Sequence, residues 1–334
     1  MLLTVYAIII TSAWIIVSLY VIINTRRIGY LHDVDAASAK EFPSVAIIIP
    51  ARNEEDEIEE ALTSVLHLNY TNKEIIVVND RSTDSTPLIL NTMSRTFPAL
   101  RLITIKELEE GWLGKNHALY KGYQSSTADW LLFTDGDVNF APDSLTKALA
   151  FAREHHTDHL VIIPQITSPS ALFKTVMNTF ALILEMKLRP WDASNPRSNA
   201  SIGVGAFNLV KRSAYEKAGT HKAFSLRPDD DLKLGEKIKR SGLKQNVLYG
   251  DHEISLKWYQ NLSQFVNGLM KNTFSVSHYN LPRAMLNALL AFLVFVLPIP
   301  LFLLAGDGLW IYALIILISQ SLLMLLRKGI SAKW

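Results

Sequence analysis

Apolar residues follow two different patterns along this chain. Near the ends they form long runs without charge, from Leu2 to Ile23, from Ala284 to Ala305 and from Leu309 to Leu326. Between these runs, short apolar stretches alternate with segments of helical spacing, such as the one from Ile58 to Leu66. Short strands that are apolar on both faces, alternating with helices, are typical of a mostly parallel sheet covered on both sides. The pattern predicts an α/β domain between membrane-spanning ends.

The strands of the sheet are predicted from five short apolar runs. These are Val45–Ile49, Ile75–Val78, Leu100–Ile105, Trp130–Phe133 and Leu160–Ile163. A helix is expected to begin near Asn53, which can cap it, because the four acidic residues that follow suit the positive end of a helix dipole. Two further segments, Ala171–Leu188 and Trp258–Tyr279, are too polar to span a bilayer. Each is expected either in the membrane interface or packed against the domain.

The three long apolar runs are interpreted as transmembrane helices, because each has about the ~20 residues that a span needs and almost no charge. The alternative is buried core helices of a soluble protein. Basic residues follow the first run directly, the reverse of their order in a signal peptide. Basic residues also flank the last two runs at Arg283 and at Arg327-Lys328, so the positive-inside rule places the middle of the chain in the cytoplasm. Pro298 and Pro300 predict a kink.

These patterns divide the 334 residues into four parts. The predicted parts are an amino-terminal anchor (1–25), an α/β domain (41–255), an interfacial segment (256–283) and a transmembrane helical hairpin (284–327). A net charge of +2 gives no sign of a nucleic-acid partner. The absence of cysteine excludes a disulfide framework, thiolate catalysis and cysteine-ligated zinc. The expected location is a cell membrane, crossed three times, with the α/β domain on the cytoplasmic side.

The sequence Asp135-Gly136-Asp137 follows directly on the predicted strand Trp130–Phe133. Residues two apart on an extended chain point to the same side, and the glycine allows the turn that brings both acids toward one point. Two carboxylates at the carboxyl end of such a strand suit Mg²⁺ or Mn²⁺, which then bridges to substrate phosphates. The alternative is an ordinary Asp-Gly turn. An EF-hand is excluded, because Phe140 stands where its glycine belongs.

Polar loops follow the first two predicted strands, Pro50–Glu54 and Asn79–Thr86, where a nucleotide would lie in an open α/β sheet. The second loop can also be a turn with a helix cap. The segment Gly111–Asn116 is not a P-loop, but Lys115 behind a glycine can meet phosphate oxygens or remain a surface lysine.

Glycines at 203 and 205 precede three successive acids, Asp229 to Asp231. The glycines allow a close approach of backbone to a bound sugar, although they do not form a dinucleotide fingerprint. The acids can cap a helix, and one of them can act as a general base. Crowding of carboxylates raises the pKa of each, which suits a base that works near neutral pH.

Five segments in this order resemble the motif set of family 2 glycosyltransferases over roughly residues 44 to 250. They read Val-Ala-Ile-Ile-Ile-Pro-Ala-Arg-Asn-Glu, Val-Val-Asn-Asp-Arg-Ser-Thr-Asp-Ser-Thr, Gly-Lys-Asn, Phe-Thr-Asp-Gly-Asp and Asp-Asp-Asp-Leu-Lys-Leu-Gly. The resemblance implies a GT-A fold, meaning a Rossmann-like, mostly parallel sheet, which here carries one amino-terminal and two carboxyl-terminal transmembrane helices. It also implies a nucleotide-sugar donor, a UDP-sugar first of all, and a metal-dependent, inverting transfer of a hexose.

The resemblance also implies roles for individual positions. Residues expected to line the nucleotide-sugar site are Pro50, Ala51, Arg52, Glu54, Asp80, Lys115, Asp135, Gly136 and Asp230. Asp135 and Asp137 would form the Asp-x-Asp motif that holds a divalent cation, Mg²⁺ or Mn²⁺, with Asp137 the firmer ligand. Asp231 aligns with the catalytic base.

One departure from the family pattern concerns the acceptor. The Gln-x-x-Arg-Trp motif of chain-extending synthases is replaced here by Gly268-Leu269-Met270-Lys271-Asn272. This sequence is similar to that of membrane-bound members that glycosylate isoprenoid lipids. The expected reaction is therefore transfer to a hydroxyl of a membrane lipid or isoprenoid. The alternatives are transfer to a polyprenyl phosphate, or an inactive membrane scaffold with the same fold.

The histidines show no metal-binding motif. His155, His156 and His159 do not match His-Glu-x-x-His and are interpreted as part of a solvated helix face. His252 is a possible further metal ligand.

Overall fold

The computed structural model describes residues 1–36, 43–168, 170–257, 262–268 and 280–326. It divides into two compact units, one made of residues 1–27 with 259–334, and one made of residues 28–258. The segments at 258–261, 269–279 and 327–334 lie outside the described residues, and with them most of the predicted interfacial segment and the end of the Gly268–Asn272 sequence. Each unit is described by itself below.

The larger unit is built on a sheet of eight strands in the order β1-β10-β7-β9-β5-β2-β3-β4. The strands are β1 (Gly29–Tyr30), β2 (Val45–Ala51), β3 (Lys73–Asp80), β4 (Leu100–Ile105), β5 (Trp130–Phe133), β7 (His159–Ile163), β9 (Asn208–Lys211) and β10 (Gln245–Tyr249). All neighbours pair in parallel except β9, which runs antiparallel to both β5 and β7. All five predicted strands are present, and the predicted α/β architecture with a mostly parallel sheet is confirmed.

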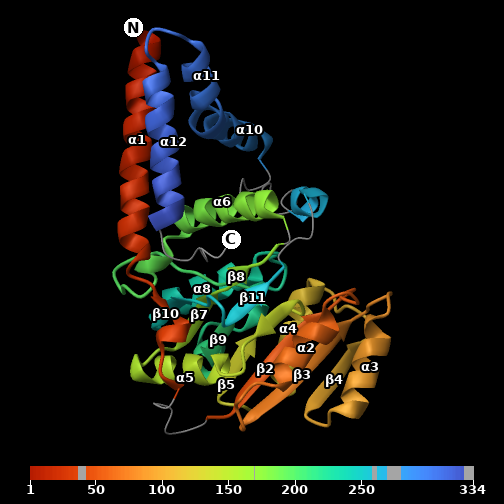
Figure 1. Cartoon of the computed structure of the whole chain (residues 1–334). Coiled ribbons are helices and arrows are strands. Elements are labelled where there is room, and N and C mark those ends of the chain that lie inside the picture. Colours follow the sequence, from red (N-terminus) through yellow and green to blue (C-terminus); the bar gives the residue numbers. More distant parts are fainter. Residues whose placement is uncertain (37–42, 169, 258–261, 269–279, 327–334) are drawn as a thin grey trace. The chain divides into compact units, whose positions relative to one another are not determined.

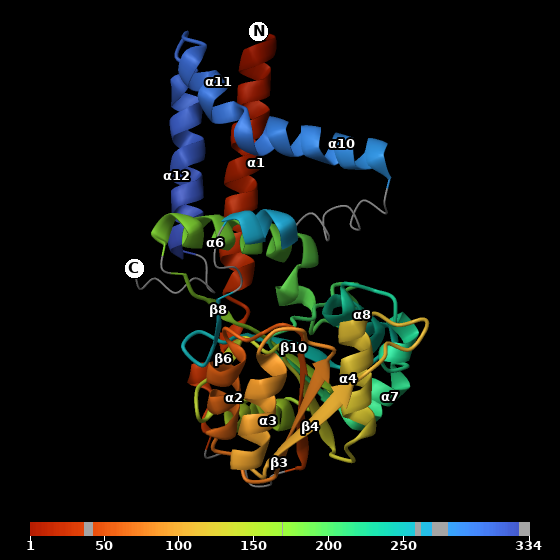
Figure 2. The ribbon, with the colours of Figure 1, turned by 90° about the vertical axis from the view of Figure 1, so that its right-hand side faces the viewer.

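Helices cover both faces of this sheet, as the apolar strands require. One buried cluster joins the strands to α2 (Ile58–Leu66), α3 (Thr86–Thr96) and α5 (Ser144–Glu154). A second cluster, on the other face, joins them to α4 (Gly114–Gln124), α7 (Arg212–Lys217) and α8 (Asp230–Arg240). Figure 2 shows the two sets of helices on opposite sides of the strands. Alternate residues of one strand enter opposite clusters, as Ile47 and Ile48 do, so the strands are apolar throughout.

Several smaller elements complete the larger unit. A short sheet in the order β6-β11-β8 joins β6 (Val138–Phe140), β8 (Gln165–Ile166) and β11 (Ile254–Leu256). Helix α6 (Ala171–Leu188) has the bounds that the sequence predicts. Short 3₁₀ turns occupy Leu31–Asp33, Pro190–Asp192 and His221–Phe224.

The smaller unit contains α1 (Leu2–Thr25), α10 (Leu281–Ala291), a π-helical stretch (Phe292–Val296), α11 (Pro298–Leu304) and α12 (Trp310–Leu326). Helices α1 and α12 run side by side (Figure 1) and bury a cluster that includes Ala7, Trp14 and Ile316. Only α1, with 24 residues, is by itself long and apolar enough to cross a membrane among the residues described. The prediction of three spans is therefore not confirmed.

The other two predicted spans differ from α1 for separate reasons. The segments Leu281–Val296 and Pro298–Leu304 meet at an angle of 49°, so they form either one broken span or a re-entrant loop. The predicted kink lies at Pro298, which has no N–H to donate to the preceding turn. Helix α12 has 17 residues, slightly fewer than a straight span needs.

Candidate active site

A cavity of about 320 Å³ lies where the strands β2, β3 and β5 end. It is lined by Pro50, Ala51, Arg52, Glu54, Asp80, Gly114, Lys115, Asp135, Gly136 and Asp137. In the sheet, Ala51 pairs with Asn79 and Ile48 pairs with Phe133, so the loops after these strands begin at one edge. The register therefore brings together residues that are more than eighty positions apart in the sequence.

The two loops after β2 and β3 hold each other by reciprocal hydrogen bonds. The backbone N–H of Asn53 donates to Ser82 Oγ (3.1 Å), and that of Thr83 donates to Asn53 Oδ1 (2.8 Å). Asn53 adopts a left-handed conformation, with φ of 57°. The prediction that a helix starts near Asn53 is therefore wrong, since α2 begins at Ile58. The Asn53 side chain caps the neighbouring loop instead.

Asp80, the last residue of β3, is buried and lines the cavity. Arg81 donates to both of its carboxylate oxygens, Nε to Oδ1 at 2.7 Å and one terminal nitrogen to Oδ2 at 3.1 Å. Arg52 lies 3.8 Å from the same carboxylate. A Cβ atom at Gly114 would overlap Asp80 Oδ2, so the first turn of α4 approaches this carboxylate as only glycine permits.

Lys115 also lines the cavity and forms a 2.6 Å ion pair with Asp135 Oδ1. Both residues also line a second, water-sized cavity of about 10 Å³, which adds Leu119, Phe133, Thr134, Gly205, Asn208, His221, Asp230, Asp231 and Leu234. Because the two cavities share Lys115 and Asp135, Asp231 lies just behind the larger cavity. The structure thus brings together every residue that the sequence analysis assigned to the site.

The Asp231 carboxylate is held by backbone donors. Its Oδ2 accepts from Gly205 N–H at 2.9 Å, and its Oδ1 accepts from Leu232 N–H at 2.7 Å. The acids Asp230 and Asp231 occupy the first turn of α8, where the helix dipole favours negative charge, as the sequence predicts.

Four carboxyl groups near the cavities, those of Glu54, Asp137, Asp230 and Asp231, have raised pKa values because burial removes water from them. Desolvation is the main cause for Glu54, whose pKa rises to about 8, and repulsion from Asp137 and Asp135 adds to it. Desolvation and Asp135 raise the pKa of Asp137 to about 6. On the Asp231 side, burial raises the pKa of Asp230 to about 7 and also raises that of Asp231. Burial alone would lower the pKa of Lys115, but the carboxylates of Asp135, Asp230 and Asp231 outweigh it and keep the ammonium charged.

The acids at the larger cavity fit a divalent cation. Glu54, Asp135 and Asp137 offer only oxygen ligands and repel one another, which is the donor chemistry that Mg²⁺ and Mn²⁺ prefer. Within the described residues, no group of three or more His, Asp or Glu side chains is placed to hold a metal ion.

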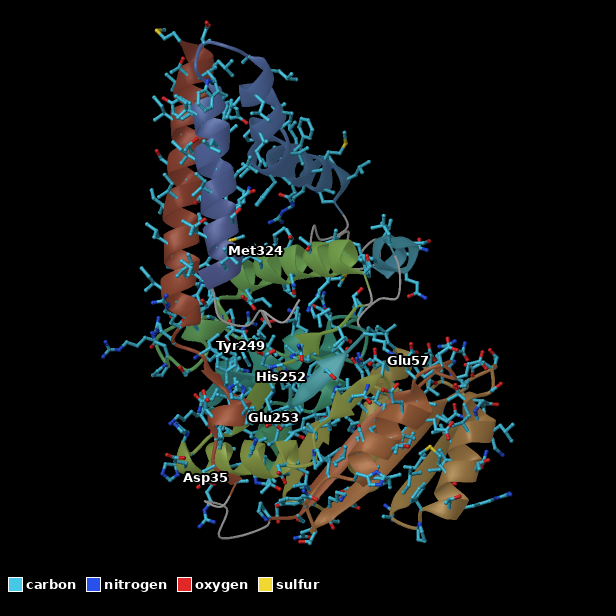
Figure 3. All side chains as sticks on the ribbon, viewed as in Figure 1. Asp35, Glu57, Tyr249, His252, Glu253 and Met324 are labelled. Atoms are coloured by element: carbon cyan, nitrogen blue, oxygen red, sulfur yellow. The ribbon has the colours of Figure 1, made fainter. Side chains whose placement is uncertain are left out.

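The histidines considered in the sequence analysis line neither cavity. His252 lies in the turn between β10 and β11, next to Glu253 (Figure 3), and lines neither cavity. The interpretation of His155, His156 and His159 as one solvated helix face is wrong for His159, which is fully buried in β7. Its neighbour Leu160 already belonged to a predicted strand, and this was the signal for its burial.

The site also contains residues that the sequence analysis did not assign to it. Gly114 lines the larger cavity, and Arg81 orients Asp80. Both stand inside quoted motifs, beside residues that were assigned. Nothing in the sequence alone shows that an arginine folds back onto the preceding aspartate.

Comparisons with known proteins identify the family of the chain. The family model for glycosyl transferase family 2 matches residues 46–219. The 4,4'-diaponeurosporenoate glycosyltransferase of Staphylococcus aureus strain MRSA252 is 24% identical over 218 residues, which are 65% of this chain and 57% of that protein. The corresponding protein of strain USA300 is 23% identical over the same length. The match thus spans little more than half the length of these relatives.

A solved structure has a similar fold. The mannosyltransferase PcManGT from Pyrobaculum calidifontis, in complex with GDP-Man and Mn²⁺, matches with a TM-score of 0.61 and 18% identity. The match covers 96% of this chain and 98% of that one. The α/β fold is therefore GT-A-like.

Proposed function

The chain belongs to glycosyl transferase family 2, and on this premise we propose that it transfers a sugar from a nucleotide-sugar to a hydroxyl of a membrane lipid or isoprenoid. The observation that carries the proposal is the 320 Å³ cavity, which is lined by the buried carboxylate of Asp80, by Lys115 and by the acids Asp135 and Asp137. Asp80 suits a nucleoside, and Lys115 suits the diphosphate. UDP-sugars are the first donors to test, and GDP-mannose is the second, because the PcManGT structure contains it.

The proposed chemistry is a single displacement with inversion at the anomeric carbon. Asp231 accepts the proton of the acceptor hydroxyl, whose oxygen forms the new bond to that carbon as the bond to the diphosphate oxygen breaks. Lys115 stays charged beside the leaving diphosphate, where its ammonium offsets the developing negative charge. Asp135 and Asp137 would hold a divalent cation, which supplies further neutralisation of the diphosphate as a Lewis acid.

The acceptor assignment rests on the relatives and on α1. The relatives are named for transfer to diaponeurosporenoate, an isoprenoid acid, which supports an isoprenoid acceptor, while the hydroxyl as accepting group rests on the proposed role of Asp231 as base. Helix α1 is long and apolar enough to anchor the chain in a bilayer. Arg26 and Arg27 directly follow the α1 run, so we place the catalytic unit on the cytoplasmic side, where nucleotide-sugars are available. The acceptor then enters from the membrane and the donor from the aqueous phase.

The test is a transfer assay on membranes that contain the full chain. Membranes with the wild-type chain, with Asp231→Asn and without the chain are incubated with Mn²⁺ and single nucleotide-sugars, and extracted lipids are analysed by mass spectrometry. We expect a lipid heavier by one hexose only with the wild type. A product that carries the sugar on a phosphate would favour the polyprenyl-phosphate alternative. No product with any donor, together with no nucleotide binding, would favour the inactive scaffold.

A further inference from the structure

The backbone of Gly205 makes hydrogen bonds to both Asp231 and Asp135. Its N–H donates to Asp231 Oδ2 at 2.9 Å, and its C=O accepts from the backbone N–H of Asp135 at 3.1 Å. Gly205 ends a short segment, Ile202–Gly205, that we call the glycine loop. The position of the Asp231 carboxylate relative to Asp135 therefore depends on where this loop is held.

The glycine loop packs against the start of α8 without room for side chains. A Cβ atom at Gly203 would overlap the backbone oxygen of Asp231, and one at Gly235 would overlap the backbone oxygen of Ile202. Contact of backbone with backbone cannot be relieved by rotation of a side chain. A small movement of the loop would therefore move the helix end that carries Asp231.

Two buried amide side chains hold the loop from the sheet side. Gln245 in β10 donates to the Ile202 carbonyl at 2.8 Å and accepts from the Ile202 N–H at 3.0 Å. Asn208 in β9 donates to the Val204 carbonyl at 2.8 Å. Gln245 and Asn208 are 1% and 2% exposed, so water cannot replace these bonds.

His159 in β7 joins the two amides. Gln245 Nε2 donates to His159 Nδ1 at 2.8 Å, and His159 Nε2 lies 3.1 Å from Asn208 Oδ1. Because the bonds to Ile202 fix the orientation of the Gln245 amide, Nδ1 must accept and Nε2 must carry the proton. Burial lowers the pKa of His159 to about 4, which keeps the ring in this neutral form near neutral pH.

We propose that His159, Asn208 and Gln245 form a buried clamp that positions the glycine loop, and through Gly205 the Asp231 carboxylate, for catalysis. His159 is a positioning residue in this scheme and touches no substrate. The inference rests on the proposed function, because it assigns to the clamp a role in the transfer step.

The test uses His159→Leu, which removes both ring nitrogens, and His159→Gln, which can still accept from one amide and donate to the other. Displacement of a reacting group by ~1 Å costs on the order of 10²-fold in rate, so the Leu variant is expected to lose about that factor in kcat. KM for the nucleotide-sugar should stay at the wild-type value, because the clamp does not line the larger cavity. The Gln variant should recover most of the lost kcat.

The matched control is Asn246→Leu, which breaks a buried bond from the next residue of β10 to Thr157 Oγ1, 2.6 Å long, away from the glycine loop. It should lower the melting temperature about as much as His159→Leu while kcat stays unchanged. If His159→Leu fails to fold, Gln245→Met replaces it. Equal losses of kcat in the Asn246 control and the clamp variants would overturn the proposal, because the effect would then be general destabilisation.

A second measurement needs no turnover. Hydrogen exchange at the Gly205 amide should become faster in His159→Leu, while exchange in the loop Asn79–Thr86 stays as in the wild type. Unchanged exchange at Gly205 overturns the clamp even if the enzyme is an active transferase. If the wild type transfers no sugar, the proposed function and the catalytic role of the clamp both fail.

Discussion

Replacement of Asp231 by Asn tests whether this carboxylate acts as the catalytic base or only supports the fold. The wild-type carboxylate accepts two backbone N–H groups, those of Gly205 and Leu232. The Asn amide has one oxygen, so it can satisfy one of these donors and turns its own N–H toward the other. A buried donor left without a partner costs about 1–3 kcal/mol.

The stability loss should be smaller than that figure, because the substitution also removes a buried charge. Burial raises the pKa of Asp231, which means that the folded state already disfavours its ionised form. We expect a net loss of ~1–2 kcal/mol in the free energy of unfolding. Each kcal/mol should lower the melting temperature by about 2–4 °C for a domain of this size. The rate should fall much further. A lost general base costs about 10²–10⁴-fold, equivalent to ~2.7–5.4 kcal/mol in the activation barrier.

The assay measures kcat at saturating donor and acceptor, nucleotide affinity and thermal melting on the same membrane preparation. Asp229→Asn is the matched control, because it makes the same chemical change two residues earlier, at the N-cap of α8, where the acid pairs with Arg227 and lines neither cavity. We expect Asp231→Asn to lose kcat and retain nucleotide affinity, and Asp229→Asn to keep both. A kcat for Asp231→Asn close to that of Asp229→Asn would refute the assignment of the base.

Three further predictions concern the rest of the site. The rate should fall as the pH drops through the pKa of Asp231, because a base must be ionised to accept a proton. Since that pKa is raised, the fall should lie above the ordinary aspartate value of 3.8. The variant Lys115→Gln should move the fall to still higher pH, because the Lys115 ammonium lowers the pKa of Asp231. A wild-type profile that is flat down to the ordinary value would contradict this, and stopped assays from pH 4 to pH 9 measure it. Gly114→Ala should weaken nucleotide binding about tenfold, or ~1.4 kcal/mol, because the new Cβ displaces Asp80 Oδ2. The variant should still fold, because alanine suits a helix. Equilibrium dialysis with UDP and GDP measures the affinity, and an unchanged affinity for both would remove Asp80 from the nucleotide site. Binding of Mn²⁺ near pH 7 should release protons, chiefly from Glu54, because its pKa of about 8 leaves it mostly protonated, whereas Asp137, with a pKa of about 6, is already mostly ionised. Calorimetry in buffers of different ionisation enthalpy counts these protons, and a count of zero would argue against a cation at these acids.

Much of the site could be predicted because it depends on local signals at strand ends. A buried apolar strand followed by acids, as at Phe133 and Asp135, places carboxylates at one edge of a parallel sheet whatever the details of packing. Five motifs in a fixed order, three of them at strand ends, then gave the resemblance to the family. Gly114 was missed because its role is a contact with Asp80 that exists only after α4 has packed against β2 and β3. Arg81 was missed because nothing in the sequence shows that its side chain turns back onto Asp80.

The sequence by itself determined the α/β class and the strands, because alternation of apolar strands and helices is a property of neighbouring residues. The residues at the larger cavity were assigned through the resemblance to a family. Tertiary structure alone decided the rest. It made Asn53 bind the loop after β3 instead of capping a helix, because its hydrogen-bond partners Ser82 and Thr83 lie in that loop. It also buried His159 between Gln245 and Asn208, residues 86 and 49 positions away. Hydrogen bonds between side chains distant in sequence form only when the sheet sets their register, so no pattern along the chain predicts them.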